Sequence, residues 1–455
     1  LTAAEYITRR YGASTQKLYT YIFLFISIFT TGSFLYPIAK IIEVAAGIPL
    51  SSSILILGVF CMIYVSLGGL RAVVVTDVLQ FIILFAAVII VIPLAFGEVG
   101  GVPEFLARVP EGFFTLFAGE YNWVFIVAFM LYNLFFLGGN WAYVQRYTSV
   151  RTPRDAKKVG VLFGVLYTFS PILWMLPPMI YRLIDPSLDS IGAEGAYLLM
   201  CREVLPVGLL GLMLGGMVFA TASSLNATLN ISSGVVTNDI FRRLRPASSD
   251  KLLIRVARIS TVLFGLMAIG VALLIPKMGG IVNVVISVAA LTGVPLYLPI
   301  IWSLFSRRQT GTSVITATLS SLGVNALFKF VMPSAGLTLN RAEEMILGVT
   351  FPAVILLSFE CYYRLRKAEA AGYGEYEVWE RKNETERQNE TLTRSSDEDN
   401  AFSRKVIGIG IASTGALITL LGLIAPTGRL LVIGIGLLLI LFGLKIRRHK
   451  AVNKK

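Results

Sequence analysis

The chain of 455 residues is 55% hydrophobic and 15% charged, and it contains 28 phenylalanines and 41 glycines. This composition excludes an ordinary soluble domain and indicates a protein of many membrane-spanning helices. The net charge of +13 does not point to a nucleic-acid partner, because the basic residues of membrane proteins gather in cytoplasmic loops.

Apolar segments follow one another along the whole chain. A helix needs about 20 apolar residues to cross the hydrocarbon core of a bilayer, and this measure predicts twelve spanning helices. Neighbouring helices can satisfy backbone groups that Gly and Pro set free, so we expect broken helices at Gly138-Gly139 and at Gly293 to Pro295. The twelve segments lie near 16–42, 52–67, 72–96, 122–145, 157–181, 207–236, 254–276, 281–305, 312–332, 344–363, 405–425 and 429–446.

The chain begins at Leu1, with no initiator methionine, no signal peptide and no spanning segment before residue 16. We therefore expect that its natural N-terminus is missing. Most of the 40 lysines and arginines fall in alternate loops and at the chain ends, and the largest groups lie in 145–160, 240–258, 363–405 and 445–455. The positive-inside rule places these loops, and both ends of the chain, in the cytoplasm.

One hydrophilic insert, residues 363–404, interrupts the apolar pattern with mixed charges and little apolar content. It reads as a cytoplasmic loop, helical at first and disordered near Ser395 to Asn400. On the opposite side, Glu194 to Leu205 is predicted to form a short interfacial helix. Residues 405–455 then contain two C-terminal spanning helices and a basic tail.

The cysteines and the histidine of this chain do not form a disulfide, metal-binding or catalytic motif. Cys61, Cys201 and Cys361 lie far apart without a paired motif, so they define neither a disulfide framework nor a metal site. The single histidine, His449, lies in the basic tail, which excludes histidine-based catalysis within the membrane. Without a paired-carboxylate or serine/histidine constellation, the sequence also argues against an intramembrane enzyme.

The spanning segment from Gly215 to Arg243 is unusually rich in hydroxyl and amide side chains. Polar groups inside a membrane are costly unless they face other helices, water or an ion. Ser223 and Ser224 lie at the centre of this stretch, and their hydroxyls are hard oxygen donors suited to a small cation such as sodium. The alternative is that these small residues let spanning helices pack closely.

Three stretches of this sequence resemble motifs of the sodium:solute symporter family. Gly68 to Gln80 resembles the family signature at the start of a spanning helix, with Thr76 and Asp77 in place. Asn133 to Arg146 looks like the discontinuous sixth core helix, and Ser223 to Phe241 is similar to the eighth core helix and its exit. The order and spacing of the motifs agree with the family, and the resemblance covers essentially the whole chain.

The resemblance implies an all-α polytopic membrane protein with the five-plus-five inverted-repeat (LeuT-like) transporter fold, lacking its first core helices. Residues 1–362 then form a transporter core of about ten spans, which contains core helices three to ten plus accessory helices. Core helix one supplies half of the sodium ligands in the family. We therefore expect that the chain as given does not transport alone.

The resemblance also assigns roles to individual residues. The carbonyl of Ala220 and the hydroxyls of Ser223 and Ser224 are expected to bind sodium, the coupling ion. Asp77 resembles the acid on the sodium release route. Its alternative is an acid that is favourable near a helix N-terminus.

On the sixth core helix, Phe136 matches the aromatic residue that closes the inner side of the substrate pocket. Asn133 and Asn140 flank it at spacings of three and four, which puts all three near one helical face. Both amides are candidates for hydrogen bonds to substrate or gate, and bonding between helices is the alternative. Tyr167 and Ala289 stand where sugar-transporting members carry polar side chains, so sugar specificity is doubtful.

The sequence as a whole predicts a sodium-coupled symporter of the cytoplasmic membrane that carries a small polar solute by alternating access. Its expected partners are the solute, sodium and the lipid bilayer, with no nucleic acid. The alternative function is a solute-sensing, transporter-like membrane module. Some family members bind a second sodium through side chains that match Asn226 and Ala227 here, and because alanine has no side-chain oxygen, we expect one sodium per solute.

Overall fold

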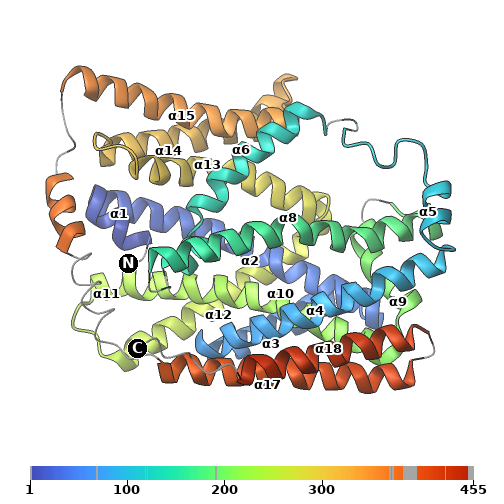
Figure 1. Cartoon of the computed structure of the whole chain (residues 1–455). Helices are drawn as coiled ribbons and strands as arrows, with labels where there is room; N and C mark the ends of the chain where they lie inside the picture. The colour runs from blue at the N-terminus through green and yellow to red at the C-terminus, as the bar shows by residue number, and fades with distance from the viewer. Residues whose placement is uncertain are drawn as a thin grey trace.

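The computed structural model describes residues 3–448 apart from 68–69, 118, 120, 149, 151, 190–191, 368–369, 371–372, 383–396 and 426. The described residues form helices, which mostly run side by side along one direction (Figure 1). Their bounds are α1 Ala3–Tyr11, α2 Ala13–Ala46, α3 Leu50–Leu67, α4 Leu70–Glu98, α5 Val102–Arg108, α6 Trp123–Gly139, α7 Trp141–Thr148, α8 Pro153–Ile184, η1 Gly192–Gly195, α9 Ala196–Val204, α10 Val207–Val235, η2 Val236–Phe241, α11 Arg242–Leu244, α12 Asp250–Leu274, η3 Ile275–Met278, α13 Ile281–Ser303, α14 Gly311–Ala326, η4 Leu327–Val331, η5 Met332–Ala335, α15 Arg341–Leu365, α17 Asp397–Ile424 and α18 Arg429–Arg448.

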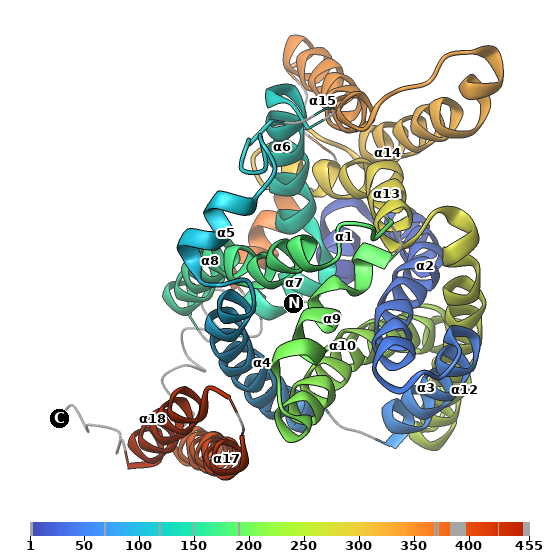
Figure 2. The ribbon, with the colours of Figure 1, turned by 90° about the vertical axis from the view of Figure 1, so that its right-hand side faces the viewer.

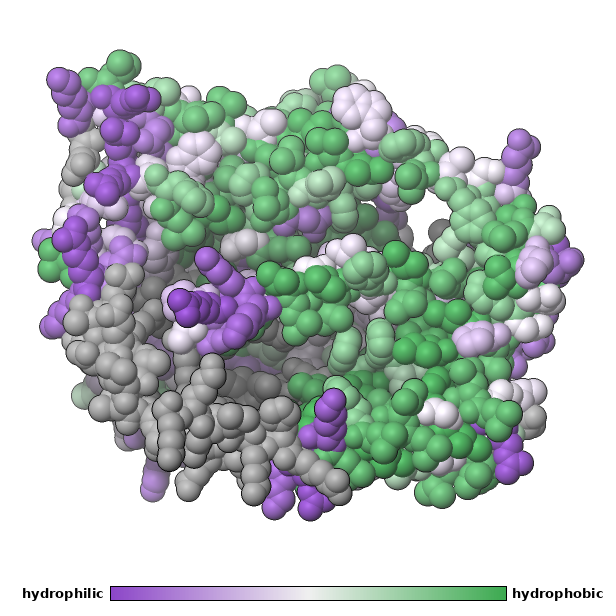
Figure 3. Space-filling model, viewed as in Figure 1, coloured by the Kyte–Doolittle hydropathy of each residue, from purple (hydrophilic) through white to green (hydrophobic). Residues whose placement is uncertain are grey.

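The predicted spanning segments are helices in the structure. Within the described residues, ten helices are long and apolar enough to cross a membrane, and two shorter apolar helices, Leu50–Ile63 and Trp123–Gly139, fill the remaining predicted positions. Apolar side chains cover most of the middle of the face seen in Figure 3, whereas hydrophilic ones gather mainly toward its two ends. The all-α, multi-pass class predicted from the sequence is confirmed.

The two predicted helix breaks have different outcomes. α6 ends at Gly139 and α7 begins at Trp141, with Asn140 between them in an extended conformation (φ −65°, ψ 125°), so this prediction is confirmed. α13 instead runs unbroken from Ile281 to Ser303, so the predicted break at Gly293 to Pro295 is wrong. Pro295 removes only one backbone donor, which a packed membrane helix tolerates.

Glycines let α6 and α13 approach each other closely. A Cβ atom on Gly293 of α13 would lie 2.1 Å from the hydroxyl of Tyr132 in α6. A Cβ atom on Gly139 of α6 would lie 2.3 Å from Cβ of Tyr297 in α13. Each helix therefore has a notch that receives an aromatic residue of the other, as expected where van der Waals packing rather than the hydrophobic effect joins membrane helices.

Three apolar clusters hold the bundle together. The first joins α2 to α3, α10, α12 and α13, and it contains the fully buried rings of Tyr19 and Tyr36. The second lies between α4, α9, α10 and α17. The third joins α6 to α13, α14 and α15. α2, α10 and α13 therefore meet at the middle of the molecule.

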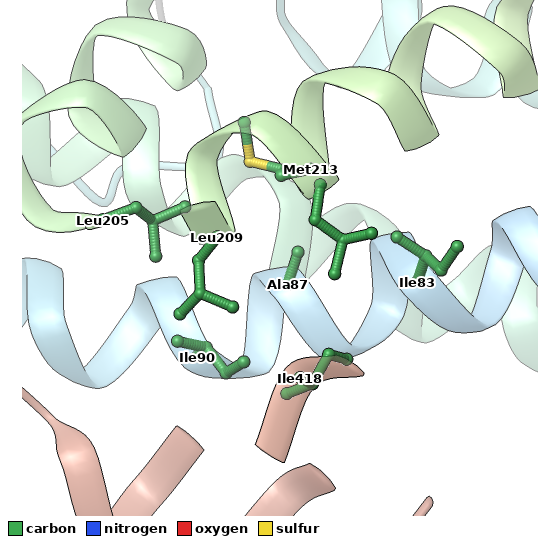
Figure 4. Close-up of a pocket in the computed structure, with 8 residues that line it drawn as sticks. Ile83, Ala87, Ile90, Leu205, Leu209, Met213 and Ile418 are labelled. Atoms are coloured by element: carbon green, nitrogen blue, oxygen red, sulfur yellow. The ribbon is translucent and has the colours of Figure 1, made fainter. Parts of the chain in front are cut away.

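Helices α17 and α18 form a hairpin at the periphery, beside α4 (Figure 2). Gly408 and Gly415 of α17 face Gly443 and Gly436 of α18 so closely that an added Cβ would lie 2.6–2.8 Å from the carbonyl oxygen of its partner. Ile418 of α17 packs against side chains of α4 and α10 (Figure 4). The hairpin is thus joined through backbone contact and attached to the core by apolar side chains.

Elements predicted to be cytoplasmic lie at one end of the molecule. α1, α11 and the 373–382 helix of the hydrophilic insert occupy the left side of Figure 1, whereas α5 and α9 lie at the opposite end. The interfacial helix predicted from Glu194 to Leu205 is present as α9, Ala196–Val204, preceded by η1. Of the residues Ser395 to Asn400, predicted to be disordered, Asp397 to Asn400 form the start of α17, so the prediction is wrong there, and Ser395 and Ser396 lie outside the described residues.

This arrangement leads to a prediction of sidedness. A single cysteine at Arg381, whose side chain is 77% exposed, should resist an impermeant maleimide added to intact cells expressing the full-length protein. A cysteine at Leu116, which is 81% exposed at the opposite end, should react readily. Both are measured after replacement of the native cysteines, and labelling of the 381 position from outside would reverse the assigned orientation.

Candidate functional site

A cavity of about 380 Å³ lies between α2, α6, α7, α8, α10 and α13. Eight of its lining residues are aromatic, and five of the others carry an aliphatic hydroxyl or an amide. None of the described lining residues is charged. The aromatic ones are Tyr19, Phe23, Phe34, Phe136, Trp141, Tyr143, Phe163 and Tyr297, and the polar ones are Ser27, Thr30, Asn140, Ser224 and Thr228.

Sequence reasoning missed the wall that α2 contributes. Phe23, Ser27, Thr30 and Phe34 repeat at intervals of three and four, which places them on one face of a helix. Phe23 stacks on Trp141 of α7 with ring centroids 4.6 Å apart. The signal that could have found this wall is the pair of hydroxyls at Ser27 and Thr30 between the two aromatic residues.

Two of the three predicted gate residues reach the cavity. Phe136 lines it and contacts two other rings, with centroids 5.8 Å from Tyr132 and 5.7 Å from Tyr297. Asn140 lines it at the break between α6 and α7. Asn133 is not among the lining residues, because its Nδ2 atom donates to the carbonyl of Phe129 in its own helix at 2.8 Å.

The predicted sodium ligands lie on α10, which faces the same cavity. Ser224 lines the cavity, and Ala220 and Ser223 lie within the preceding turn and are half-buried. The hydroxyl of Thr228 donates to the carbonyl of Ser224 at 3.0 Å. Hydroxyl and carbonyl oxygens suit a hard cation rather than a transition metal, and no cluster of His, Cys, Asp and Glu that could hold a metal occurs among the described residues.

Asp77 lies two turns inside α4, which already begins at Leu70. The first turn of this helix contains no acid, so stabilisation of the helix N-terminus does not account for Asp77. Its side chain lies outside the described residues. α4 packs against α10, the helix of the predicted sodium ligands.

Asn226 lies one turn beyond Ser223 on α10. Its side chain is 3% exposed, and its Oδ1 atom has no hydrogen-bond partner among the described residues. The neighbouring Ala227 lines the cavity but has no side-chain oxygen to offer. Of the two positions that match the second sodium site of some family members, only Asn226 therefore offers a side-chain oxygen.

Comparison with known proteins identifies the family. The model of the sodium:solute symporter family matches residues 1–319. The chain belongs to this family. The family prediction made from the three motifs is confirmed, and the sodium:solute symporter family consists of transporters rather than enzymes, as the sequence indicated.

Several sodium-coupled transporters are similar to this chain. The sodium/glucose cotransporter of Vibrio parahaemolyticus is 27% identical over 390 residues, which are 78% of this chain and 70% of that protein. A sodium/mannose cotransporter of Bos taurus is 28% identical over 73% of this chain and 63% of its own length. A sodium-dependent multivitamin transporter of Oryctolagus cuniculus is 27% identical over 65% and 49%. The chain thus spans about half to two thirds of its mammalian relatives.

The fold is that of a solved Na+-coupled symporter. A Na+-coupled sialic acid symporter in a substrate-bound, outward-open state superposes with a TM-score of 0.65 at 21% identity, covering 79% of this chain and 76% of that one. This likeness confirms the inverted-repeat transporter fold. Tyr167, one of the two positions that made sugar specificity doubtful, is 54% exposed on α8 and, like Ala289, does not line the cavity.

Proposed function

We propose that the full protein uses a sodium gradient to drive uptake of a small polar solute across the membrane by alternating access. One observation carries the proposal: Ser224, Phe136 and Asn140, each expected from its motif to act in transport, line one cavity although they come from separate parts of the chain. Alternating access needs an ion site and a gate at one solute site. A solute-sensing module would share the cavity but would need no net transport.

The cavity lining supports a solute that carries no net charge on the part that faces these helices. Hydroxyls of Ser27 and Thr30 and the amide of Asn140 offer hydrogen bonds, whereas rings such as Phe23 and Trp141 offer flat apolar faces. Few placed polar groups among apolar walls are typical of small-molecule sites. We propose that the solute lies between α2 and the α6–α7 break, and that Phe136 closes the side next to Tyr297.

Sodium is proposed to bind at α10 beside the solute. Ala220, Ser223 and Ser224 supply oxygen atoms from one helix, and Asp77 on the adjacent α4 receives the ion on its way to the cytoplasm. One sodium per solute is expected, because Ala227 offers no oxygen and Asn226 is a single amide.

Uptake by the full-length protein in proteoliposomes tests this function. A panel of radiolabelled neutral polyols, sugars, amino acids and vitamins should contain a solute whose accumulation requires an inward sodium gradient and fails with potassium. The sodium dependence of that uptake should give a Hill coefficient near one. A coefficient approaching two would overturn the single-ion stoichiometry. Binding of a solute without accumulation would favour the sensor.

A further inference from the structure

The helix formed by residues 373–382 of the hydrophilic insert docks on α1 through aromatic rings. Tyr373, Tyr376 and Trp379 repeat at intervals of three, so they share one helical face. The ring of Tyr376 meets the edge of Tyr6 with centroids 5.9 Å apart, and the Arg9 guanidinium lies 5.4 Å from the ring centroid of Trp379. We call this face the ring face.

Tyr373, the first residue of the ring face, covers Arg10. The Arg10 guanidinium lies 4.7 Å from the ring centroid of Tyr373 and 5.0 Å from that of Tyr11, and the residue is 3% exposed. One of its nitrogens donates to the carbonyl of Ser306 at 3.0 Å. No ion pair of Arg10 is found among the described residues, so this hydrogen bond and the two cation–π contacts supply its electrostatic support.

α1 in turn connects the cytoplasmic ends of the helices that line the cavity. It precedes α2, and the hydroxyl of its Tyr6 lies 2.6 Å from that of Ser303 at the end of α13. Arg243 of α11, which is connected to α10 by η2, donates to Gln16 of α2 at 2.5 Å. α1 also contacts α7. The ring face therefore packs on α1 at the point where α1 connects α2, α7, α10 and α13.

We propose that the 373–382 helix is an autoinhibitory clamp that, when docked, keeps the cytoplasmic side of the cavity closed. The proposal rests on the proposed function, because it regulates the same cavity. Opening toward the cytoplasm requires the ends of α2, α10 and α13 to separate, and Tyr6, Arg10 and Arg243 join them. Release of the ring face loosens that junction and favours the open form.

The contacts at Arg10 also make the clamp reversible. Its Nε and Nη1 atoms are buried without a hydrogen-bond partner among the described residues, which opposes docking because water would satisfy them. The rings favour docking, since a cation–π contact contributes roughly a twofold to fivefold factor at an exposed site such as Arg9 and roughly thirtyfold at a desolvated one such as Arg10. Opposed contributions of similar size let the docked and released forms coexist.

The test measures access to the cavity from the cytoplasmic side. In the full-length protein with Cys61, Cys201 and Cys361 replaced, Ala227→Cys places one thiol in the cavity. Its rate of reaction with an impermeant maleimide is followed in inside-out vesicles. The double variant Tyr373→Ala/Trp379→Ala should raise this rate at least about fivefold, because two ring contacts are lost.

Two further variants make the result decisive. Val378→Ala alters the same helix at a side chain that is 70% exposed and should leave the rate unchanged. Arg9→Ala removes an exposed partner of Trp379 without touching the buried junction, and it should raise the rate about twofold to fivefold. An unchanged rate in Arg9→Ala and the double variant would overturn the clamp.

Sodium alone serves as the second probe and separates the two proposals. In the protein with an intact clamp, sodium should slow labelling of Ala227→Cys, because a bound ion on α10 occupies the same cavity. Absence of any sodium effect on the labelling rate would contradict the proposed function. The labelling rates of the variants would then still decide whether the clamp exists. Sodium protection together with equal rates in all variants would retain the function and reject the clamp.

Discussion

Replacing Ser223 and Ser224 together by alanine is expected to abolish the stimulation of uptake by sodium. Each hydroxyl that contacts a charged group contributes about 1.5–3 kcal/mol, so the loss of two should raise the sodium concentration for half-maximal uptake at least about a hundredfold. The measurement is initial uptake by reconstituted full-length protein over a range of sodium concentrations.

A matched control on the same helix is Ser233→Ala. Ser233 is buried, and its hydroxyl donates to the carbonyl of Asn230 at 3.1 Å, so its replacement removes a hydroxyl from α10 without touching the proposed ion site. It should keep the sodium dependence of the parent protein. Full sodium stimulation in the Ser223→Ala/Ser224→Ala variant would show that the hydroxyls serve helix packing and that the ion binds elsewhere.

Replacing Phe136 by alanine is expected to raise the KM for the solute about tenfold, which corresponds to about 1.4 kcal/mol of lost contact. The ring lies on the cavity wall between Tyr132 and Tyr297, and truncation leaves that side open while the aromatic pairs are lost. Kinetics of sodium-driven uptake give KM and maximal rate separately. Leakage of sodium without solute would be a second sign of an open gate.

Phe135→Ala is the matched control for this change. Phe135 is the adjacent ring of α6, but it packs into the cluster between α6, α13 and α15 and does not line the cavity. It should alter yield or thermal stability and leave KM unchanged. If both variants raise KM equally, the effect comes from the packing of α6, and Phe136 is not a gate.

The sequence predicted the elements of the fold well, because the bilayer sets helix length and leaves few alternatives. The wrong prediction of a helix break at Gly293 shows that the sequence pattern does not reveal which residues pack against one another. A glycine two residues before a proline predicts a helix break, yet Gly293 makes room for the side chain of Tyr132, a residue about 160 positions earlier in the chain. Only the packing of α6 on α13 distinguishes a notch from a break.

The candidate site was predicted in part. Motifs identified Phe136, Asn140 and Ser224, which do line the cavity. They also indicated Asn133, whose amide bonds to its own helix, since a short amide in a membrane helix has a nearby carbonyl as partner. The aromatic wall of α2 escaped notice because rings in a spanning segment look alike whether they face lipid, protein or a cavity.

The notches between α6 and α13 determine where this molecule can bend. α6 is fastened to α13 through Gly139 and Gly293, whereas α7 packs on α8 and α1. The two halves of the interrupted helix thus have different main neighbours, and we expect any displacement of one half against the other to be concentrated in the extended residue Asn140. Because Asn140 also lies on the cavity wall, we expect a solute bound there to contact the residue at which the two half-helices pivot.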